Sequence, residues 1–504
     1  MGTVRQRCAL EQIRVVYYWK SAAFTINLHK HDNSLMIPLA KSIWAKHFDG
    51  PGGILELLPI AFPMFLSSMF DMLMMFIDRL FLSRVGVVHQ AAAMSGGITS
   101  WMVVSFFVGI VGYSSALIAQ YFGASQKHNC TRMVRQTLWC ALLSYPLILL
   151  VDVLVSASPI FSGHSPLELE LEHRYFWYMA FGSICALLRF TYGSFFTGIG
   201  RTRIVLAGNI TALFVNIVAN WMLIFGHCGF PALGLDGAAI GTIMSGASAA
   251  IVLIIAYWRV SSHGEWQNDR KASLIERNKL AKLIRYGLPQ GCENVLSMIG
   301  FVILVSSFHT YGDDIAAATT ISFNWDGFSF HPLLGIQVAV TTLVGQAMGA
   351  NCPDRAVRVA RSGYKVALTY AALMLILFVS CTGILVGIFT PESSGLDYAR
   401  VREYAIPMLR MAGLYLMTDA VYLISAGTIR GAGDTFWCMV IHIINNCILI
   451  GVILLCVHCF HLPPLTVWLI FVIIGMLSSS AFFTRYKLGR WKSMRIIEQE
   501  KPLP

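Results

Sequence analysis

Charged residues are scarce in this sequence. Asp, Glu, Lys and Arg together make up 12% of its 504 residues, whereas soluble domains contain about 25%. Hydrophobic residues make up 56%, and the mean hydropathy is +0.64. So little charge excludes a large soluble core and indicates a membrane protein with many spans.

Clusters of basic residues on one folded face are also lacking. The formal net charge is +11, but the Lys and Arg residues lie in short segments between apolar runs. This distribution is typical of the positive-inside rule, and nucleic-acid binding proteins instead concentrate their basic residues on one surface. We therefore expect a lipid bilayer as the macromolecular partner and no nucleic acid.

Recognisable patterns of disulfides, metal ligands or catalytic groups are absent as well. The 12 cysteines are scattered, mostly in apolar segments, where cysteine behaves as a small hydrophobe. The densest group, residues 456–461, contains two Cys and two His, but a closed zinc site usually separates its ligand pairs by a dozen or more residues. No span contains a His-Glu or Ser-Lys motif. We expect no enzyme, no cofactor and no metal beyond a coupling Na⁺ at buried acids.

What the sequence does contain is about twelve apolar segments long enough to cross a bilayer. They predict an all-α polytopic fold of two tandem six-helix bundles around a central cleft. The predicted units are a tail at 1–53, an N-lobe at 54–258, a linker at 259–286, a C-lobe at 287–484 and a tail at 485–504. Lys and Arg are frequent in the tails and the linker, so we expect both termini to be cytoplasmic.

The two halves repeat each other. A Gly-x-Gly-x-Thr elbow at 198–202 recurs at 431–435, which is 233 residues later. Three further echoes lie 226 to 230 residues apart: Pro59 and Pro289, Gln120 and Gln346, and Asn216 and Asn446. Repeats with an even number of helices run parallel, and transporters of this kind bind substrate between the halves and alternate access by rocking.

Acids inside the apolar spans are the first candidate functional residues: Asp78, Glu293, Asp326 and Asp419. A charge at the bilayer centre costs about 2.5–3.5 kcal/mol on insertion scales, so an acid there indicates a function. Asp326 follows the outer turn at Gly312 by about thirteen residues, which places it about 20 Å deep.

Each acid also has a structural interpretation. Asp78 has arginines nearby in sequence, at Arg79 and Arg84, and could pair with one of them. Glu293 lies about one turn into its helix, where a carboxylate could cap the helix or reach the membrane surface. Asp326 could form a hydrogen bond with His331 at a kink.

Two amides, Asn216 and Asn220, complete the candidate set. Their i, i+4 spacing places both on one face of a helix. In a membrane such side chains turn toward the bundle, either to join two helices or to contribute to an ion or substrate site.

Five motifs in this order resemble the multidrug and toxic compound extrusion (MATE) family over residues 54–484. They are residues 78–86, 198–203, 216–239, 346–351 and the stretch from Asp419 to Asp434. The resemblance implies a monomeric secondary transporter in the bacterial inner membrane. It would export organic cations or amphiphilic drugs by antiport with Na⁺ or H⁺.

The resemblance also implies roles for particular residues. Asp78 matches the N-lobe acid, with Asn216 and Asn220 as its site partners, and Asp419 matches the C-lobe acid of the NorM-like branch. Glu293 lies near the helix-7 glutamate of that branch. A buried carboxylate that binds a proton, a Na⁺ or a cationic substrate one at a time would couple export to ion entry. The alternative is a flippase for lipid-linked saccharides or another lipid, which would require a basic cleft.

Overall fold

The computed structural model describes residues 50–158, 165–262, 266, 274–389 and 398–498. Most of the predicted tail at 1–53, and the last residues of the tail at 485–504, lie outside these ranges. Within them the chain is helical, and 12 helices are long and apolar enough to cross a membrane. The prediction of an all-α polytopic protein is confirmed.

The first set of helices forms the N-lobe. Its members are α3 (Ile54–Val85), α4 (Val87–Gly112), α5 (Ser114–Gly123), α6 (Lys127–Ser156), α7 (Pro166–Gly198), α8 (Thr202–Phe225) and α9 (Leu235–Ser261). Helices α4 and α5 form one span that is interrupted at Tyr113. Helix α8 packs along α9 and α3, and α4 packs along α7.

The second set forms the C-lobe. Its members are α10 (Arg277–His309), α11 (Asp313–Gly349), α12 (Pro353–Ser380), α13 (Thr382–Gly387), α14 (Tyr398–Ala432), α15 (Thr435–Leu454), the π-helix η3 (Leu455–Cys459), α16 (Pro464–Lys487) and the 3₁₀ turn η4 (Arg490–Ser493). Helix α14 lies at the centre of this lobe, in contact with α11, α12 and α16.

Several helices begin earlier than the apolar runs predict. Helix α7 starts at Pro166, in the acidic stretch before its apolar run, and Ser165 caps it by accepting a hydrogen bond from the Glu168 amide. Helix α10 starts at Arg277, which shortens the linker predicted to extend to residue 286. The reason is physical: hydropathy marks only the hydrocarbon-spanning part, whereas the helix continues into the polar interface.

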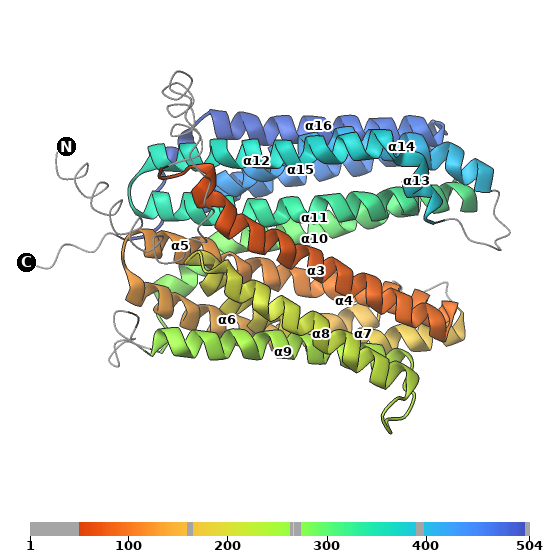
Figure 1. The fold of residues 1–504 in the computed structure, drawn as a ribbon, viewed down its shortest axis with the longest axis horizontal. Coiled ribbons are helices and arrows are strands. Elements are labelled where there is room, and N and C mark those ends of the chain that lie inside the picture. Colours follow the sequence, from red (N-terminus) through yellow and green to blue (C-terminus); the bar gives the residue numbers. More distant parts are fainter. Residues whose placement is uncertain (1–49, 159–164, 263–265, 267–273, 390–397, 499–504) are drawn as a thin grey trace, which may run out of the picture.

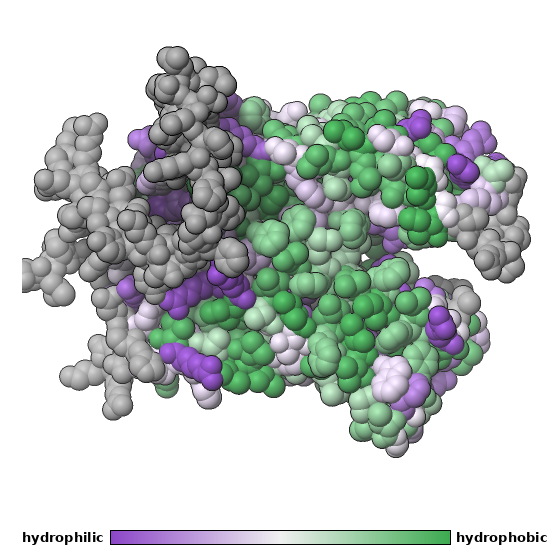
Figure 2. Space-filling view, viewed as in Figure 1, coloured by the Kyte–Doolittle hydropathy of each residue, from purple (hydrophilic) through white to green (hydrophobic). Residues whose placement is uncertain are grey.

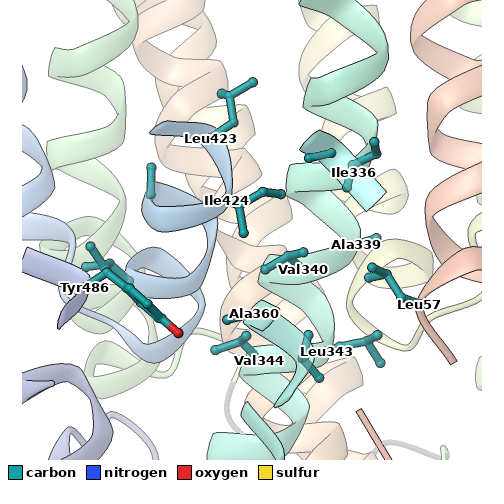
Figure 3. Close-up of a cluster of buried hydrophobic side chains, with 14 of the residues drawn as sticks. Leu57, Ile336, Ala339, Val340, Leu343, Val344, Ala360, Leu423, Ile424 and Tyr486 are labelled. Atoms are coloured by element: carbon teal, nitrogen blue, oxygen red, sulfur yellow. The ribbon is translucent and has the colours of Figure 1, made fainter. Parts of the chain in front are cut away.

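The two lobes lie side by side and meet at one end of the molecule (Figure 1). We call this the linker end, because residues 274–276, which precede α10, lie there, and we call the opposite end the distal end. Helix α3 joins the lobes: Leu57 near its start belongs to a C-lobe core, together with Leu343 and Val344 of α11 (Figure 3). Toward the distal end the lobes diverge, and the surface between them is hollowed (Figure 2). The cleft therefore opens at the distal end.

Glycines bring the lobes into close contact near the linker end. A Cβ at Gly123 would lie 1.9 Å from the Gln346 carbonyl oxygen, and one at Gly349 would lie 2.0 Å from the Gln120 carbonyl oxygen. The two contacts are equivalent under the internal repeat. Only glycine permits such an approach of two helix backbones, so these positions are required for the lobes to close here.

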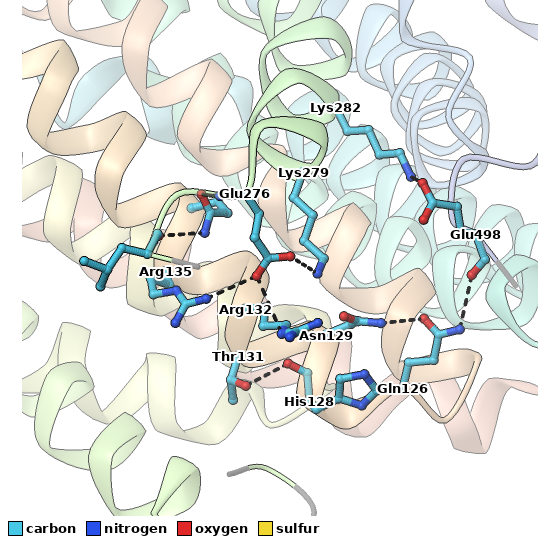
Figure 4. A network of polar contacts seen from close by, with 12 residues as sticks. Gln126, His128, Asn129, Thr131, Arg132, Arg135, Glu276, Lys279, Lys282 and Glu498 are labelled. Atoms are coloured by element: carbon cyan, nitrogen blue, oxygen red, sulfur yellow. Dashed lines mark hydrogen bonds and ion pairs between the residues drawn. The ribbon is translucent and has the colours of Figure 1, made fainter. Parts of the chain in front are cut away.

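A polar cluster also links the lobes at the linker end (Figure 4). Glu276 contacts Arg135 of the N-lobe at 3.1 Å and forms an ion pair with Lys279 at the start of α10. Lys282 of α10 contacts Glu498 at 2.8 Å, and the backbone carbonyl of Glu498 accepts a hydrogen bond from the side chain of Gln126 in the N-lobe.

The segment after η4 crosses this end of the molecule. Trp491 stacks on Tyr486 of the C-lobe, whereas Ile496 is buried in a cluster with Met133 and Phe196 of the N-lobe. Gly433, at the C-lobe elbow, has φ +106°, and a Cβ there would lie 2.0 Å from Ile496 Cδ1. We call residues 494–498 the strap, because they contact both lobes where the cleft is closed.

Candidate functional site: buried acids in both lobes

The N-lobe site is centred on Asp78 of α3. Asn220 of α8 donates its side-chain amide to the carboxylate, and Asn216 and Thr242 lie beside it. A Cβ at Gly241 of α9 would lie 2.1 Å from Asn220 Oδ1, so glycine there is what allows the amide to fit between the helices. The structure thus brings together three residues that the sequence predicted, from two helices.

Oxygen atoms in this site lack protein partners. Asn216 and Asn220 are fully buried, and within the described residues neither Asn216 Oδ1 nor Asn220 Oδ1 accepts a hydrogen bond. Burying such acceptors without compensation is costly. A carboxylate surrounded by neutral oxygens is the donor set that hard cations prefer. The residues present therefore fit a small cation or a proton.

The structural alternative for Asp78 is wrong in this structure. Arg79 and Arg84 are both exposed, and among the ion pairs of the described residues neither one pairs with Asp78. The Asp78 carboxylate is therefore not neutralised by its sequence neighbours.

Three hydrogen bonds fix α3 against α8. The Thr202 hydroxyl donates to the Ile60 carbonyl at 3.1 Å, and Asn209 Nδ2 donates to the Ser67 hydroxyl at 2.7 Å. The Asn220–Asp78 bond is the third, and in all three the bonded residues are 142 positions apart in the sequence. A constant separation means that two parallel helices keep one register, which positions the asparagine face against the acid.

A second charged group, the Asp71–Arg189 pair, lies on the linker side of Asp78, and sequence patterns did not predict this pairing. Arg189 of α7 contacts Asp71 of α3 through Nη2, at 2.7 Å to Oδ1 and 2.9 Å to Oδ2. Asn209 adds a hydrogen bond of 3.2 Å to Asp71 Oδ2. Asp71 precedes Asp78 by seven residues, so both project from nearly the same face of α3. The sequence contained one signal for this group: Asp71 lies in an apolar run, seven residues before Asp78.

In the C-lobe, Asp419 of α14 and Asp326 of α11 lie close enough for their charges to interact, and Tyr415 forms a hydrogen bond with Asp419. One oxygen of each acid, Asp326 Oδ1 and Asp419 Oδ2, is buried without a partner in the described residues. The alternative hydrogen bond between Asp326 and His331 does not form within the described residues, and His331 Nδ1 contacts the Gly327 carbonyl at 2.7 Å. The structure thus forms an acid pair that the sequence had predicted only as separate residues.

Glu293 occupies a different position. It is buried and forms an ion pair with Arg430 of α14, the arginine of the second elbow. The structural alternative for Glu293, a helix cap or surface-reaching carboxylate, is therefore wrong. Arg430 also fixes the lobes, because its carbonyl accepts a hydrogen bond from the Tyr113 hydroxyl of the N-lobe at 3.1 Å.

One buried acid has no role in these groups. Asp152 of α6 has both carboxylate oxygens buried without a hydrogen bond in the described residues. It lies in the apolar run 147–155, where it could have been noticed from the sequence. Within the described chain no group of three or more His, Cys, Asp or Glu side chains could hold a metal ion.

Two lobes with buried acids on either side of a cleft define a polytopic membrane transporter. The MatE family model matches the chain twice, at residues 63–222 and 289–457. The chain therefore belongs to the MatE family, which is a family of transporters rather than of enzymes, and the two matches follow the internal repeat.

Known relatives agree with this assignment. The chain is 25% identical over 461 residues to the probable multidrug resistance protein NorM of Thermotoga maritima, covering 88% of this chain and 95% of that protein. It is 26% identical to the multidrug resistance protein PmpM of Pseudomonas aeruginosa, covering 80% and 82%. The fold matches an outward-facing multidrug resistance MATE transporter with a TM-score of 0.77 at 19% identity, covering 88% and 96%. The NorM-like resemblance inferred from the motifs is confirmed.

Proposed function

We propose that this protein exports small organic cations and amphiphiles from the cell by antiport with Na⁺ or H⁺. The observation that carries the proposal is the set of buried carboxylates whose neighbouring oxygens lack partners, at Asp78 in one lobe and at Asp326 and Asp419 in the other. The multidrug-resistance names of the relatives support the substrate class.

Mutual exclusion at these acids accounts for the coupling. A carboxylate in a medium of low dielectric binds one positive partner at a time, because a second charge would be buried without compensation. An entering cation therefore displaces an organic cation from the acid. Rocking of the lobes about the linker end then exposes the cleft alternately to the two sides of the membrane.

The linker end faces the cytoplasm in this proposal. The polar segments there contain the arginines and lysines of the linker and of the α6 and α12 starts, as the positive-inside rule requires. The chain would act as a monomer in the bacterial inner membrane, with a cleft that now opens to the outside.

Transport by purified protein in lipid vesicles tests the proposal. An imposed proton or sodium gradient should drive uptake of a cationic dye such as ethidium, and Asp78→Asn or Asp419→Asn should abolish the gradient-dependent part. Asn keeps the size of the side chain but removes its charge. Asp354→Asn, an exposed acid at the start of α12 outside the candidate sites, is the control. Gradient-driven transport that is unchanged in both variants would contradict the proposal.

The flippase alternative requires a strongly basic cleft for a lipid pyrophosphate. Among the arginines within the spans, Arg189 and Arg430 are each paired with an acid, whereas Arg79 of α3 is exposed and Arg410 of α14 contacts the Thr382 hydroxyl. The charge of Arg430 is therefore compensated and that of Arg189 is partly offset, so these two arginines do not make the cleft strongly basic, which favours the export of cations over the flipping of a polyanionic lipid.

A further inference from the structure

The Asp71–Arg189 pair is not sealed within the N-lobe. The side chains remain 38% and 21% exposed, although Asp71 lies midway along α3. Exposing an ion pair to lipid at this depth costs several kcal/mol, so intramembrane charges face the bundle interior or a water-filled cavity. The open side of the pair therefore faces the aqueous cleft.

The surrounding contacts support this position. Met72, the next residue on α3, lies near Gly327 of the C-lobe helix α11, where a Cβ would be 3.6 Å from Met72 Cε. Phe190, the next residue on α7, lies near Gly112 of α4, and α4 packs against α10 of the C-lobe. Both neighbours of the pair are thus on helix segments next to the lobe interface.

The Arg189 guanidinium has N–H groups that do not contact Asp71. Both of its contacts to Asp71 come from Nη2, and an arginine carries five N–H groups in a planar fork. The N–H groups on Nε and Nη1 make no hydrogen bond within the described residues. They point to different sides of the guanidinium, and each remains available to donate a charge-assisted hydrogen bond to a carboxylate.

Asp78 lies on nearly the same face of α3, seven residues toward the distal end. A rise of 1.5 Å per residue separates the two groups by about 10 Å along the helix. The N-lobe wall therefore presents one unpaired acid and, about 10 Å deeper, one arginine with free donors. An aromatic molecule with an amine at one end and a carboxylate at the other could contact both.

We propose that Arg189, held by Asp71, is a specificity-determining residue that binds the carboxylate of zwitterionic amphiphiles while Asp78 binds their amine. The proposal rests on the proposed export function and narrows its substrate class. Asp71 acts as a positioning residue: it offsets part of the arginine charge, so that simple cations are not repelled from the same wall.

A matched pair of dyes tests this role. A rhodamine with a free carboxylate and the methyl ester of the same dye share the ring system and the amino groups, and differ only in the group that would contact Arg189. Arg189→Gln should raise KM for the free acid about tenfold or more, with KM for the ester and for ethidium changed less than about twofold. Arg189→Lys, which keeps the charge but not the planar fork, should fall between these values.

The controls separate specificity from folding. Arg174→Gln removes an arginine of the same helix that pairs with Asp236 near the distal end, and should not change the ratio of KM values for the two dyes. The double variant Asp71→Asn with Arg189→Gln leaves no unpaired charge. It should fold if the single variant does not, and should show the same loss for the free acid.

Three outcomes are distinguishable. Wild-type protein that transports none of the dyes under either gradient would overturn the export function itself. Transport of both dyes with an unchanged ratio of KM values in Arg189→Gln would overturn only the carboxylate subsite. An equal loss for all dyes in both the single and the double variant would show that the pair is structural and would also overturn the subsite.

Discussion

The side-chain amide of Gln120 in the N-lobe donates a hydrogen bond of 2.9 Å to the carbonyl of Gly431 in the C-lobe. The equivalent bond in the other direction joins Gln346 to the Gly198 carbonyl, also at 2.9 Å. The two glycines belong to the repeated elbows, so each lobe binds the elbow of the other. This reciprocal pair closes the linker end on both sides of the internal symmetry axis.

Removing these amides should shift the protein toward a state that is open at the linker end. Gln120→Ala leaves a buried carbonyl without a donor, which costs about 1–3 kcal/mol, and this cost is paid only in the closed state. Gln346→Ala should act in the same direction, and the double variant more strongly. Spin labels at the exposed Cys228 and at Asp313→Cys, one at the distal end of each lobe, should report shorter distances.

The control for this experiment is Gln290→Ala, because within the described residues the Gln290 amide donates only to Asn294 of the same helix. It should leave the distal distance unchanged. An unchanged distance in the double variant would show that other contacts determine which end of the cleft is closed.

Glu293 should prove necessary for stability. Glu293→Gln leaves Arg430 buried without its acid, and breaking a buried pair from one side costs about 3–5 kcal/mol. We expect a lower melting temperature in detergent. The double variant Glu293→Gln with Arg430→Met should recover much of the stability, because no charge then remains buried. A single variant that melts like the wild type would contradict the buried pair.

Disrupting the strap should loosen the closed end. Ile496→Asp introduces a charge into an apolar cluster that also contains Cys130, which is fully buried. With Cys130 as the sole cysteine, its labelling by a maleimide should become faster. Ser493→Asp adds the same charge to an exposed position directly before the strap, and should leave the labelling rate unchanged. Equal rates in both variants would rule out a role of the strap in closure.

Acid should weaken the linker-end cluster. Burial raises the pKa of Glu276, but the hydrogen bond and charge of Lys279, together with Arg132 and Arg135, outweigh this effect and hold the pKa below its usual value of 4.5. The carboxylate therefore contributes stability above pH 4.5, and the contribution is lost as the pH falls through the lowered pKa. Since the group is partly exposed, we expect less than about 1 kcal/mol.

The difference in melting temperature between the wild type and Glu276→Gln measures this contribution. It should be constant from pH 6 to pH 8, and should shrink toward zero below about pH 4. A difference that grows on acidification would contradict the assigned direction of the pKa shift.

Sequence reasoning predicted the fold and part of the site. The spans could be predicted because the bilayer imposes a length and a hydropathy on every helix, and the repeat because its echoes keep a nearly constant separation. Asn216 and Asn220 could be placed on one helix face because of their i, i+4 spacing, whereas their grouping with Asp78, on another helix, was implied by the family resemblance. Thr242 and Tyr415, which complete the two acid sites, were missed because a hydroxyl in an apolar helix is too common to stand out.

The sequence by itself determined that this chain crosses the membrane about twelve times in two similar halves, because hydropathy and repetition are local properties of the chain. Only the tertiary structure decided which charge meets which partner. Glu293 pairs with Arg430 across 137 residues, and Asp71 pairs with Arg189 across 118. These pairings depend on the rotation and register of helices that meet only after packing, and no spacing along one helix specifies them.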